Sequence, residues 1–177
     1  MLRGFIAGIV LTLAVILAAG YFGIVSGRLI PANADAKPGR FEKWAARASL
    51  RATLRREVTK TKRPLVETDK NLLAGIKLYG ENCAACHGTA TGDRSTTNIA
   101  KGLYQKPPQL ASDGVERDPE SVIFWKIKHG IRLTGMPAFS NTLNDTQLWQ
   151  MTLFLKHMDR LPPNSNRAWH AMKTPSS

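Results

Sequence analysis

The two cysteines of the chain, Cys83 and Cys86, stand three positions apart and are followed directly by His87. Two thiols at this spacing can each add to one vinyl group of a haem, which forms two thioether links, and the adjacent imidazole can then bind the iron. The pattern therefore predicts one covalently bound haem c, attached at Cys83 and Cys86, with His87 as an axial ligand of the haem iron.

Other uses of two cysteines fit the sequence less well. A zinc site needs more ligands, usually a second pair at a defined spacing, but the chain has no further cysteine and its remaining histidines show no such spacing. A redox-active C-x-x-C is expected beside a β-α-β pattern, and none is visible. A disulfide across so short a loop would close almost no chain. The last alternative is that the C-x-x-C-H pattern occurs here by chance.

A covalently held haem iron needs a sixth ligand or an open site, and Met136 is the best candidate for the ligand. It lies 49 residues after His87 and directly before Pro137, which disfavours helix at the preceding residue and keeps Met136 extended. A thioether sulfur suits iron in electron transfer and raises its reduction potential. The other candidates are Met151, Met158, His129 and His157. The first two lie on the apolar stripe of a predicted helix, which favours core packing, and His129 suits a helix C-terminus.

Three helices are expected to position these residues. The first covers 69–81 and is capped by Thr68. The second follows Asp118 as N-cap and Pro119 as first helical residue, continues over 121–129, and ends at Gly130. The third is capped by Asn144 in a capping box and closes at the prolines 162 and 163. Residues 88–113 read as an ordered loop, and strand signals are weak throughout.

The net charge of +12 is concentrated before this helical region. Residues 37–63 contain ten Lys or Arg and two acids, whereas residues 69–162 contain eleven Lys or Arg and nine acids. The basic segment has almost no interleaved aromatic residues and no nucleic-acid-reading module, so we expect no nucleic-acid partner. Within it, Arg47, Arg51 and Arg55 share one face if residues 41–58 are helical. That helix is either a solvated spacer or a helix lying on anionic headgroups.

Gly4 to Val25 form a stretch of 22 residues without a charge. About 20 apolar residues span a bilayer, while the apolar region of a cleavable signal peptide has roughly 7–15. We expect a transmembrane anchor over 1–28. A cleaved signal peptide is the alternative, because residues 32–36 contain two small-residue patterns typical of cleavage sites. The expected organisation continues with a basic linker over 29–68, a haem domain over 69–162 and a flexible tail over 163–177.

The residues around the C-x-x-C-H motif resemble those of class I c-type cytochromes, over about 69–160. Gly75 and Tyr79 precede Cys83 at four-residue intervals, as in the first helix of that family, where the Gly and the aromatic residue lie at the crossing with the last helix. Pro108-Gln109-Leu110 is similar to the family's loop after the haem motif. The resemblance implies that the Pro108 carbonyl accepts a hydrogen bond from His87 and that Leu110 packs on the porphyrin. Because Pro107 is adjacent, the proline that accepts this hydrogen bond is either Pro107 or Pro108.

The resemblance implies an all-α fold of the small cytochrome c type, with three or more helices around one covalent haem, behind the transmembrane helix and the basic linker. It also implies electron transfer rather than catalysis on a small-molecule substrate, because two axial ligands leave no open iron position. The expected partners are a membrane and redox proteins that donate and accept electrons. Haem attachment through this motif resembles the process of the bacterial periplasm, so we place the domain on that side of the inner membrane. The basic residues after the span argue for the opposite side.

Two other functions remain open. The chain could be a fixed cytochrome subunit of an oxidase or dehydrogenase complex, with the basic linker as an interface helix. It could also be a haem sensor in which Met136 is displaced by a ligand.

Overall fold

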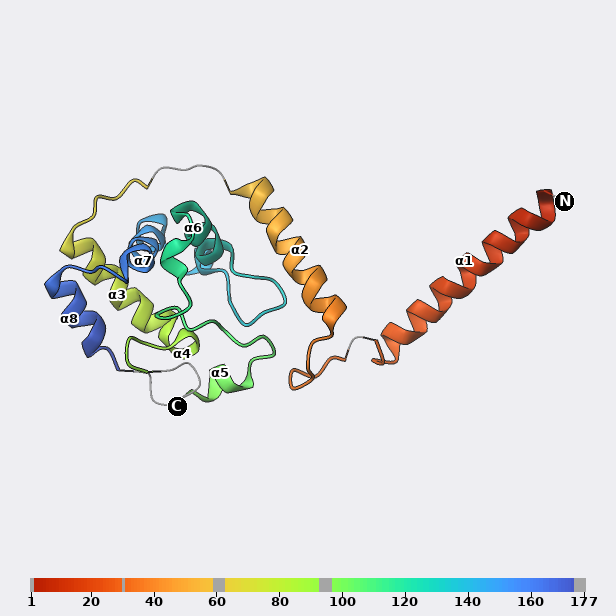
Figure 1. The fold of residues 1–177 in the computed structure, drawn as a ribbon, viewed down its shortest axis with the longest axis horizontal. Helices are drawn as coiled ribbons and strands as arrows, with labels where there is room; N and C mark the ends of the chain where they lie inside the picture. Colours follow the sequence, from red (N-terminus) through yellow and green to blue (C-terminus); the bar gives the residue numbers. More distant parts are fainter. Residues whose placement is uncertain (1, 30, 59–62, 93–96, 174–177) are drawn as a thin grey trace. The chain divides into compact units, whose positions relative to one another are not determined.

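The computed structural model describes residues 2–29, 31–58, 63–92 and 97–173. These residues form α-helices and short 3-10 helices and contain no strand (Figure 1), which confirms the all-α fold class. The chain divides into two compact units, Met1–Ala36 and Lys37–Ser177. Residues 59–62 of the expected linker and 174–177 of the expected tail lie outside the described residues.

The first unit contains α1 (Leu2–Val25), a helix of 24 residues with no buried side chain. At about 1.5 Å per residue its length is about 36 Å, which exceeds a hydrocarbon core of about 30 Å. Among the described residues it is the one helix long and apolar enough to cross a membrane, although a signal sequence passes the same test. Helix α1 therefore fits the expected transmembrane segment.

Two capped helices form the centre of the second unit. Helix α3 (Asp69–Asn82) begins after Thr68, whose hydroxyl accepts a hydrogen bond from the backbone N–H of Asn71 at 3.2 Å. Helix α7 (Asp145–His157) begins after Asn144, and Asn144 and Gln147 exchange two hydrogen bonds of 3.0 Å between side chain and backbone. Both predicted starts are confirmed, because these side chains satisfy N–H groups that a helix leaves without partners.

Helices α3 and α7 meet at Gly75. A Cβ atom at this position would lie 2.2 Å from the carbonyl oxygen of Gln150 and 2.9 Å from Cβ of Phe154. Both distances are shorter than van der Waals contact, so only a residue without a side chain lets the two backbones approach this closely. The predicted crossing at Gly75 is confirmed.

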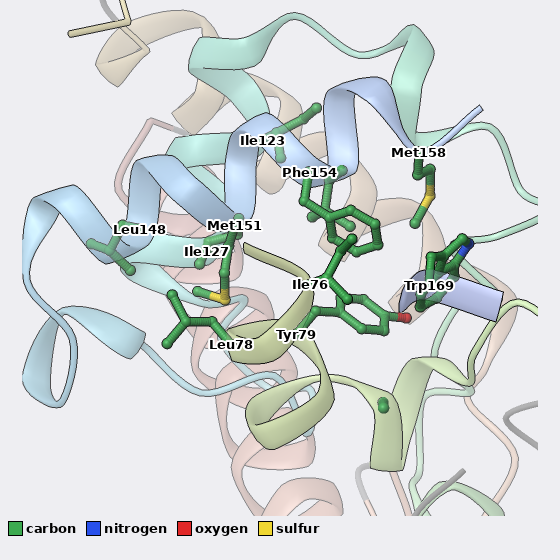
Figure 2. Close-up of a cluster of buried hydrophobic side chains, with 12 residues drawn as sticks. Ile76, Leu78, Tyr79, Ile123, Ile127, Leu148, Met151, Phe154, Met158 and Trp169 are labelled. Atoms are coloured by element: carbon green, nitrogen blue, oxygen red, sulfur yellow. The ribbon is translucent and has the colours of Figure 1, made fainter. Parts of the chain in front are cut away.

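The core surrounds this crossing and is closed by an aromatic cluster of Tyr79, Phe154 and Trp169 (Figure 2). The three rings pack edge to face, with centroids 5.0 to 5.4 Å apart, an arrangement that aromatic quadrupoles favour. Trp169 belongs to α8 (Pro163–Ala171) and is only 3% exposed. The expectation of a flexible tail over 163–177 is therefore wrong for residues 163–171. Pro163 stands at the first position of α8, where proline is well tolerated.

The second predicted helix begins later than expected. Helix α6 (Glu120–His129) has Pro119 at the cap position instead of the first helical position. The carboxylate of Asp118 instead accepts a hydrogen bond from Nζ of Lys126 at 2.6 Å. The ammonium of Lys126 thus takes the acceptor that would have capped the helix. Gly130 ends α6 as predicted, with a φ of 64°.

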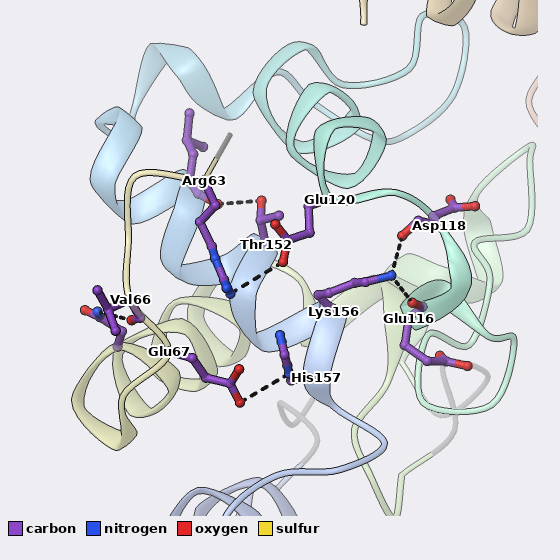
Figure 3. Close-up of polar contacts among 11 residues, drawn as sticks. Arg63, Val66, Glu67, Glu116, Asp118, Glu120, Thr152, Lys156 and His157 are labelled. Atoms are coloured by element: carbon purple, nitrogen blue, oxygen red, sulfur yellow. Dashed lines mark hydrogen bonds and ion pairs between the residues drawn. The ribbon is translucent and has the colours of Figure 1, made fainter. Parts of the chain in front are cut away.

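Helix α7 also holds the loop before α6. Nζ of Lys156 donates to the backbone carbonyls of Glu116 at 2.6 Å and Asp118 at 2.9 Å (Figure 3). These bonds fix the 3-10 helix η2 (Val115–Arg117) against α7. Lys156 is half-buried, and its ammonium holds two carbonyls of the loop, so it connects α7 to the segment before α6.

The segment that leads into α3 packs against the far end of α7. Oε1 of Glu67 lies 3.3 Å from Nδ1 of the buried His157, and a guanidinium nitrogen of Arg63 lies 3.4 Å from Oε1 of Glu120 (Figure 3). Burial lowers the pKa of His157, and the charge of Glu67 opposes that shift. The chain is thus already attached to the domain from Arg63 onward.

Helix α2 (Arg40–Glu57) forms where the basic segment was expected to be helical. None of its residues is buried. Its described hydrogen bond to the rest of the second unit runs from the hydroxyl of Tyr104 to Oε1 of Glu42, at 2.5 Å. Helix α2 is therefore a surface helix with few ties to the core.

We predict that Gly75→Ala destabilises the second unit by roughly 1–3 kcal/mol, because the added methyl group overpacks the helix crossing. Gly80→Ala in the same helix is the matched control, since its Cβ would meet only the flexible end of Met172 at 3.1 Å. That change should be neutral or stabilising by up to about 1 kcal/mol, because Ala favours helix over Gly. Denaturant unfolding followed by near-ultraviolet circular dichroism measures both. Equal effects of the two substitutions would contradict the close crossing.

Candidate functional site

The C-x-x-C-H segment forms one helical turn, α4 (Ala84–His87), directly after α3. The backbone N–H of His87 donates to the carbonyl of Cys83 at 2.8 Å, and that of Cys86 donates to the same carbonyl at 3.0 Å. Both thiols are unoxidised and half-buried. Burial raises the pKa of Cys83 to about 12 and raises that of Cys86 as well. Both cysteines therefore belong to one short turn, Cys83 as its N-cap residue and Cys86 within it.

A tyrosine from α3 supports the end of this turn. The hydroxyl of Tyr79 donates to the carbonyl of Gly88 at 2.8 Å in a buried position. Gly88 has a φ of 76°, and a Cβ there would lie 2.3 Å from the side-chain oxygen of Gln109 and 2.5 Å from the carbonyl of Gly92. Glycine is thus required by both backbone conformation and space. The chain turns sharply after His87 and is held by the core helix.

The ring of His87 is oriented by the loop that follows. Its Nδ1 lies 2.9 Å from the carbonyl oxygen of Pro108. Because a carbonyl only accepts hydrogen bonds, Nδ1 carries the proton, and the lone pair of the imidazole is on Nε2. The sequence left open whether Pro107 or Pro108 contacts His87, and in the structure it is Pro108.

Gln109 joins the two segments on either side of this contact. Its side-chain amide donates to the carbonyls of Thr89 at 3.1 Å and Gly92 at 3.3 Å, and its backbone N–H donates to the carboxylate of Asp113 at 2.7 Å. Leu110, the next residue, packs against the hydrophobic core. The position of Pro108 is therefore fixed by the two residues that follow it.

The predicted loop over 88–113 contains a short helix, α5 (Asn98–Gly102), that sequence reasoning missed. The hydroxyl of Thr97 accepts from the backbone N–H of Ala100 at 3.1 Å and donates to the carbonyl of Ala85 at 2.5 Å. One side chain thus caps α5 and ties it to the turn between the two cysteines. A threonine in front of a helix is a recognisable cap signal, but its bond to Ala85 joins residues distant in sequence.

Met136 is half-buried in the loop that follows α6. Its backbone N–H donates to the hydroxyl of Thr134 at 3.1 Å, and its carbonyl accepts from Ile131 at 3.2 Å. At Gly135 a Cβ would lie 2.3 Å from a methyl carbon of Leu103, so this loop lies against the segment after α5. The loop tip carries Leu133 at a φ of 61°, a left-handed conformation that is costly for leucine.

The other methionines and histidines considered as iron ligands have different surroundings. Met151 and Met158 belong to the core cluster and are 1% and 8% exposed, which confirms their packing role. His129 lies beside the ring of Trp125 at 5.0 Å between centroids. His157 faces Glu67, as described above. Met136 is the candidate that lies in a loop outside the core cluster.

The donor set fits a covalently bound haem. Two free cysteines belong to one helical turn, and the adjacent imidazole has its Nδ1 bound to a carbonyl, which fixes the ring as outer hydrogen bonds do for metal-binding histidines. Within the part of the chain that the structure describes, no group of three or more His, Cys, Asp or Glu comes together as a metal site.

Comparison with known proteins agrees with this geometry. Residues 70–155 match the family model described as "Cytochrome C oxidase, cbb3-type, subunit III". Cytochrome c6 of Leptolyngbya boryana is 34% identical over 82 residues, which cover 46% of this chain and 86% of that protein.

A second relative is much longer than this chain. The quinohemoprotein alcohol dehydrogenase ADH IIB of Pseudomonas putida is 25% identical over 99 residues, or 56% of this chain, and the chain spans only 13% of the dehydrogenase. No solved structure matches the chain. The match with most of cytochrome c6, the family model and the C-x-x-C-H turn together show that this chain belongs to the c-type cytochromes, the haem proteins of electron transport.

Proposed function

We propose that this chain is a membrane-anchored, mono-haem c-type cytochrome that passes electrons between respiratory or dehydrogenase partners. The observation that carries the proposal is the turn of Cys83 to His87, with Nδ1 of His87 bound to Pro108, in a chain of the cytochrome family. The haem supplies the one-electron chemistry when it is bound. The chain has to hold it in one ligand set, exclude water and present it to partners.

In this proposal Cys83 and Cys86 would form the two thioether links, and His87 would bind the iron through Nε2. The carbonyl of Pro108 holds the imidazole in that tautomer and orientation. Met136 would supply the second protein ligand of the iron, and its loop is braced at Gly135 by Leu103. Leu110, which packs against the core, would cover the porphyrin and keep water away.

The proposed anchor is α1, in a bacterial inner membrane, with the haem domain, which α8 extends to residue 171, in the periplasm. The length and apolarity of α1 support a span. The many basic residues after α1 oppose this orientation by the positive-inside rule. Attachment of a haem through C-x-x-C-H is our reason for preferring the periplasmic side.

Mass spectrometry tests the covalent haem. We expect the mature protein to be coloured and to exceed the mass of the mature polypeptide by one haem. The variant Cys83→Ala/Cys86→Ala should lose that mass, because no thioether can form. Colourless wild-type protein with the mass of bare polypeptide would end the proposal, and a second haem mass would contradict the mono-haem assignment.

Absorption spectra test the sixth ligand. Met136→Ala should abolish the charge-transfer band of methionine-bound ferric haem and lower the reduction potential, within the roughly 0.8 V range that axial ligands control. Met172→Ala is the matched control, because Met172 contacts Gly80 at the edge of the core. A band that persists in Met136→Ala would contradict the ligand assignment. Binding of carbon monoxide by the reduced wild-type protein at neutral pH would favour the haem sensor.

The second candidate is a fixed subunit of an oxidase or dehydrogenase complex. The matched family model is named after an oxidase subunit, and the Pseudomonas relative is a dehydrogenase. These names favour retaining the subunit as a candidate function. Extraction in mild detergent followed by size-exclusion chromatography separates the two functions. We expect a monomer for the shuttle, whereas stoichiometric co-purification with other subunits would favour the complex.

A further inference from the structure

Helix α2 carries opposite charges on two faces. Its acidic residues face the rest of the second unit, where the hydroxyl of Tyr104 donates to Glu42 at 2.5 Å. At the other end, the guanidinium of Arg56 and, more weakly, the indole of Trp125 hold the pKa of Glu57 below its usual value. Glu57 also lines a pocket together with Trp125 and α6 residues. Glu42 therefore attaches the N-terminal end of α2 to the domain, and Glu57 lies beside α6 at the C-terminal end.

The opposite face is basic, and its charged residues are exposed. Its members recur every three or four residues, which places them on one side of a helix. They are Arg40, Lys43, Arg47, Arg51 and Arg55. Among the described residues, no acidic side chain forms a salt bridge with any of these five. A stripe of five cations over an 18-residue helix is thus presented to the surroundings without an internal counter-charge.

Two large aromatic side chains accompany this stripe at the N-terminal end of α2. Phe41 is 76% exposed and Trp44 is 62% exposed, with ring centroids 5.6 Å apart. Trp44 follows Arg40 by four positions and precedes Arg47 by three, so it lies on the basic face. Cations interspersed with exposed aromatic rings are typical of helices that lie in a membrane interface, where indole rings reside at headgroup depth.

We propose that the basic face of α2 binds the anionic phospholipid headgroups of the membrane that holds α1. The inference rests on the proposed anchor. Residues 26–39 link the two helices and reach about 50 Å at most when extended, at roughly 3.5 Å per residue. A bilayer is therefore always within reach, at a high effective concentration. An acidic protein would also complement the charge, but Phe41 and Trp44 and the short tether favour lipid.

The proposal gives α2 a role in orientation. Its acidic face is bonded to Tyr104 and lies beside Trp125, while its basic face contacts the bilayer. The helix then lies between the membrane and the haem domain and turns a fixed side of the domain toward the lipid. A cytochrome held in this way presents its remaining surface to partners embedded in the same membrane.

The experiment uses the full-length, haem-loaded protein in lipid nanodiscs of either neutral phosphatidylcholine or the same lipid mixed with phosphatidylglycerol. Hydrogen exchange of residues 40–57 is measured by mass spectrometry. We expect exchange in α2 to be roughly tenfold slower in the anionic discs and the difference to vanish near 1 M salt, where the Debye length is about 3 Å. Equal exchange in both discs would overturn the proposal.

Two variants of equal net charge sharpen the test. Arg47→Gln/Arg51→Gln/Arg55→Gln should lose the effect of anionic lipid, whereas Lys70→Gln/Lys77→Gln/Lys101→Gln, all exposed elsewhere on the domain, should retain it. Loss in both would show that net charge alone acts and would overturn the proposal. So would slowing that appears only when an acidic protein is added.

Failure of the lipid-binding proposal can be distinguished from failure of the proposed function. A haem absorption spectrum shows whether the cytochrome is loaded, and retention in discs at high salt shows whether α1 anchors it. If the chain leaves the discs at high salt, the anchor fails, and co-sedimentation with phosphatidylglycerol vesicles still tests α2. Binding there supports the lipid site, and no binding overturns it.

Discussion

The close approach of α3 and α7 at Gly75 is the constraint on which the rest of the domain depends. Because no side chain separates the two backbones, Phe154 can reach Tyr79 and complete an aromatic cluster with Trp169. Tyr79 then donates to the carbonyl of Gly88, directly after the C-x-x-C-H turn. A packing contact without any chemistry of its own is therefore connected, through one buried hydroxyl, to the residues that would hold the cofactor.

The site itself is assembled from short segments that have little stability alone. The four-residue helix α4 is bound to α5 by Thr97 and to the next loop by Pro108, and the residues directly after it are bound by Tyr79 of α3 and by Gln109. Each of these hydrogen bonds joins a side chain to a backbone group. Backbone groups of the loops thus find hydrogen-bond partners without strands or long helices. A haem domain of this kind can have much irregular backbone and still orient one imidazole.

The sequence was sufficient for the features that depend on local chemistry. Thr68, Asn144 and Gly130 set helix ends through bonds within a few residues, and the Gly75 crossing follows from the resemblance to the cytochrome family. Residues 163–171 resemble a tail in sequence because the segment is polar, and its buried residues, Ser165 and Trp169, are enclosed only by contacts with α3 and α7. Lys126 takes the carboxylate of Asp118 in the same way, through a partner eight residues away.

The position of Trp169 has a consequence for the order of events during synthesis. Ninety residues separate it from Tyr79, so the aromatic cluster cannot form until most of the domain has been made. Contacts so distant in sequence slow folding. During that interval the cysteine segment is not yet enclosed by the core. A chain translocated in an unfolded state would therefore keep its thiols open to the maturation machinery until its C-terminal helix arrives.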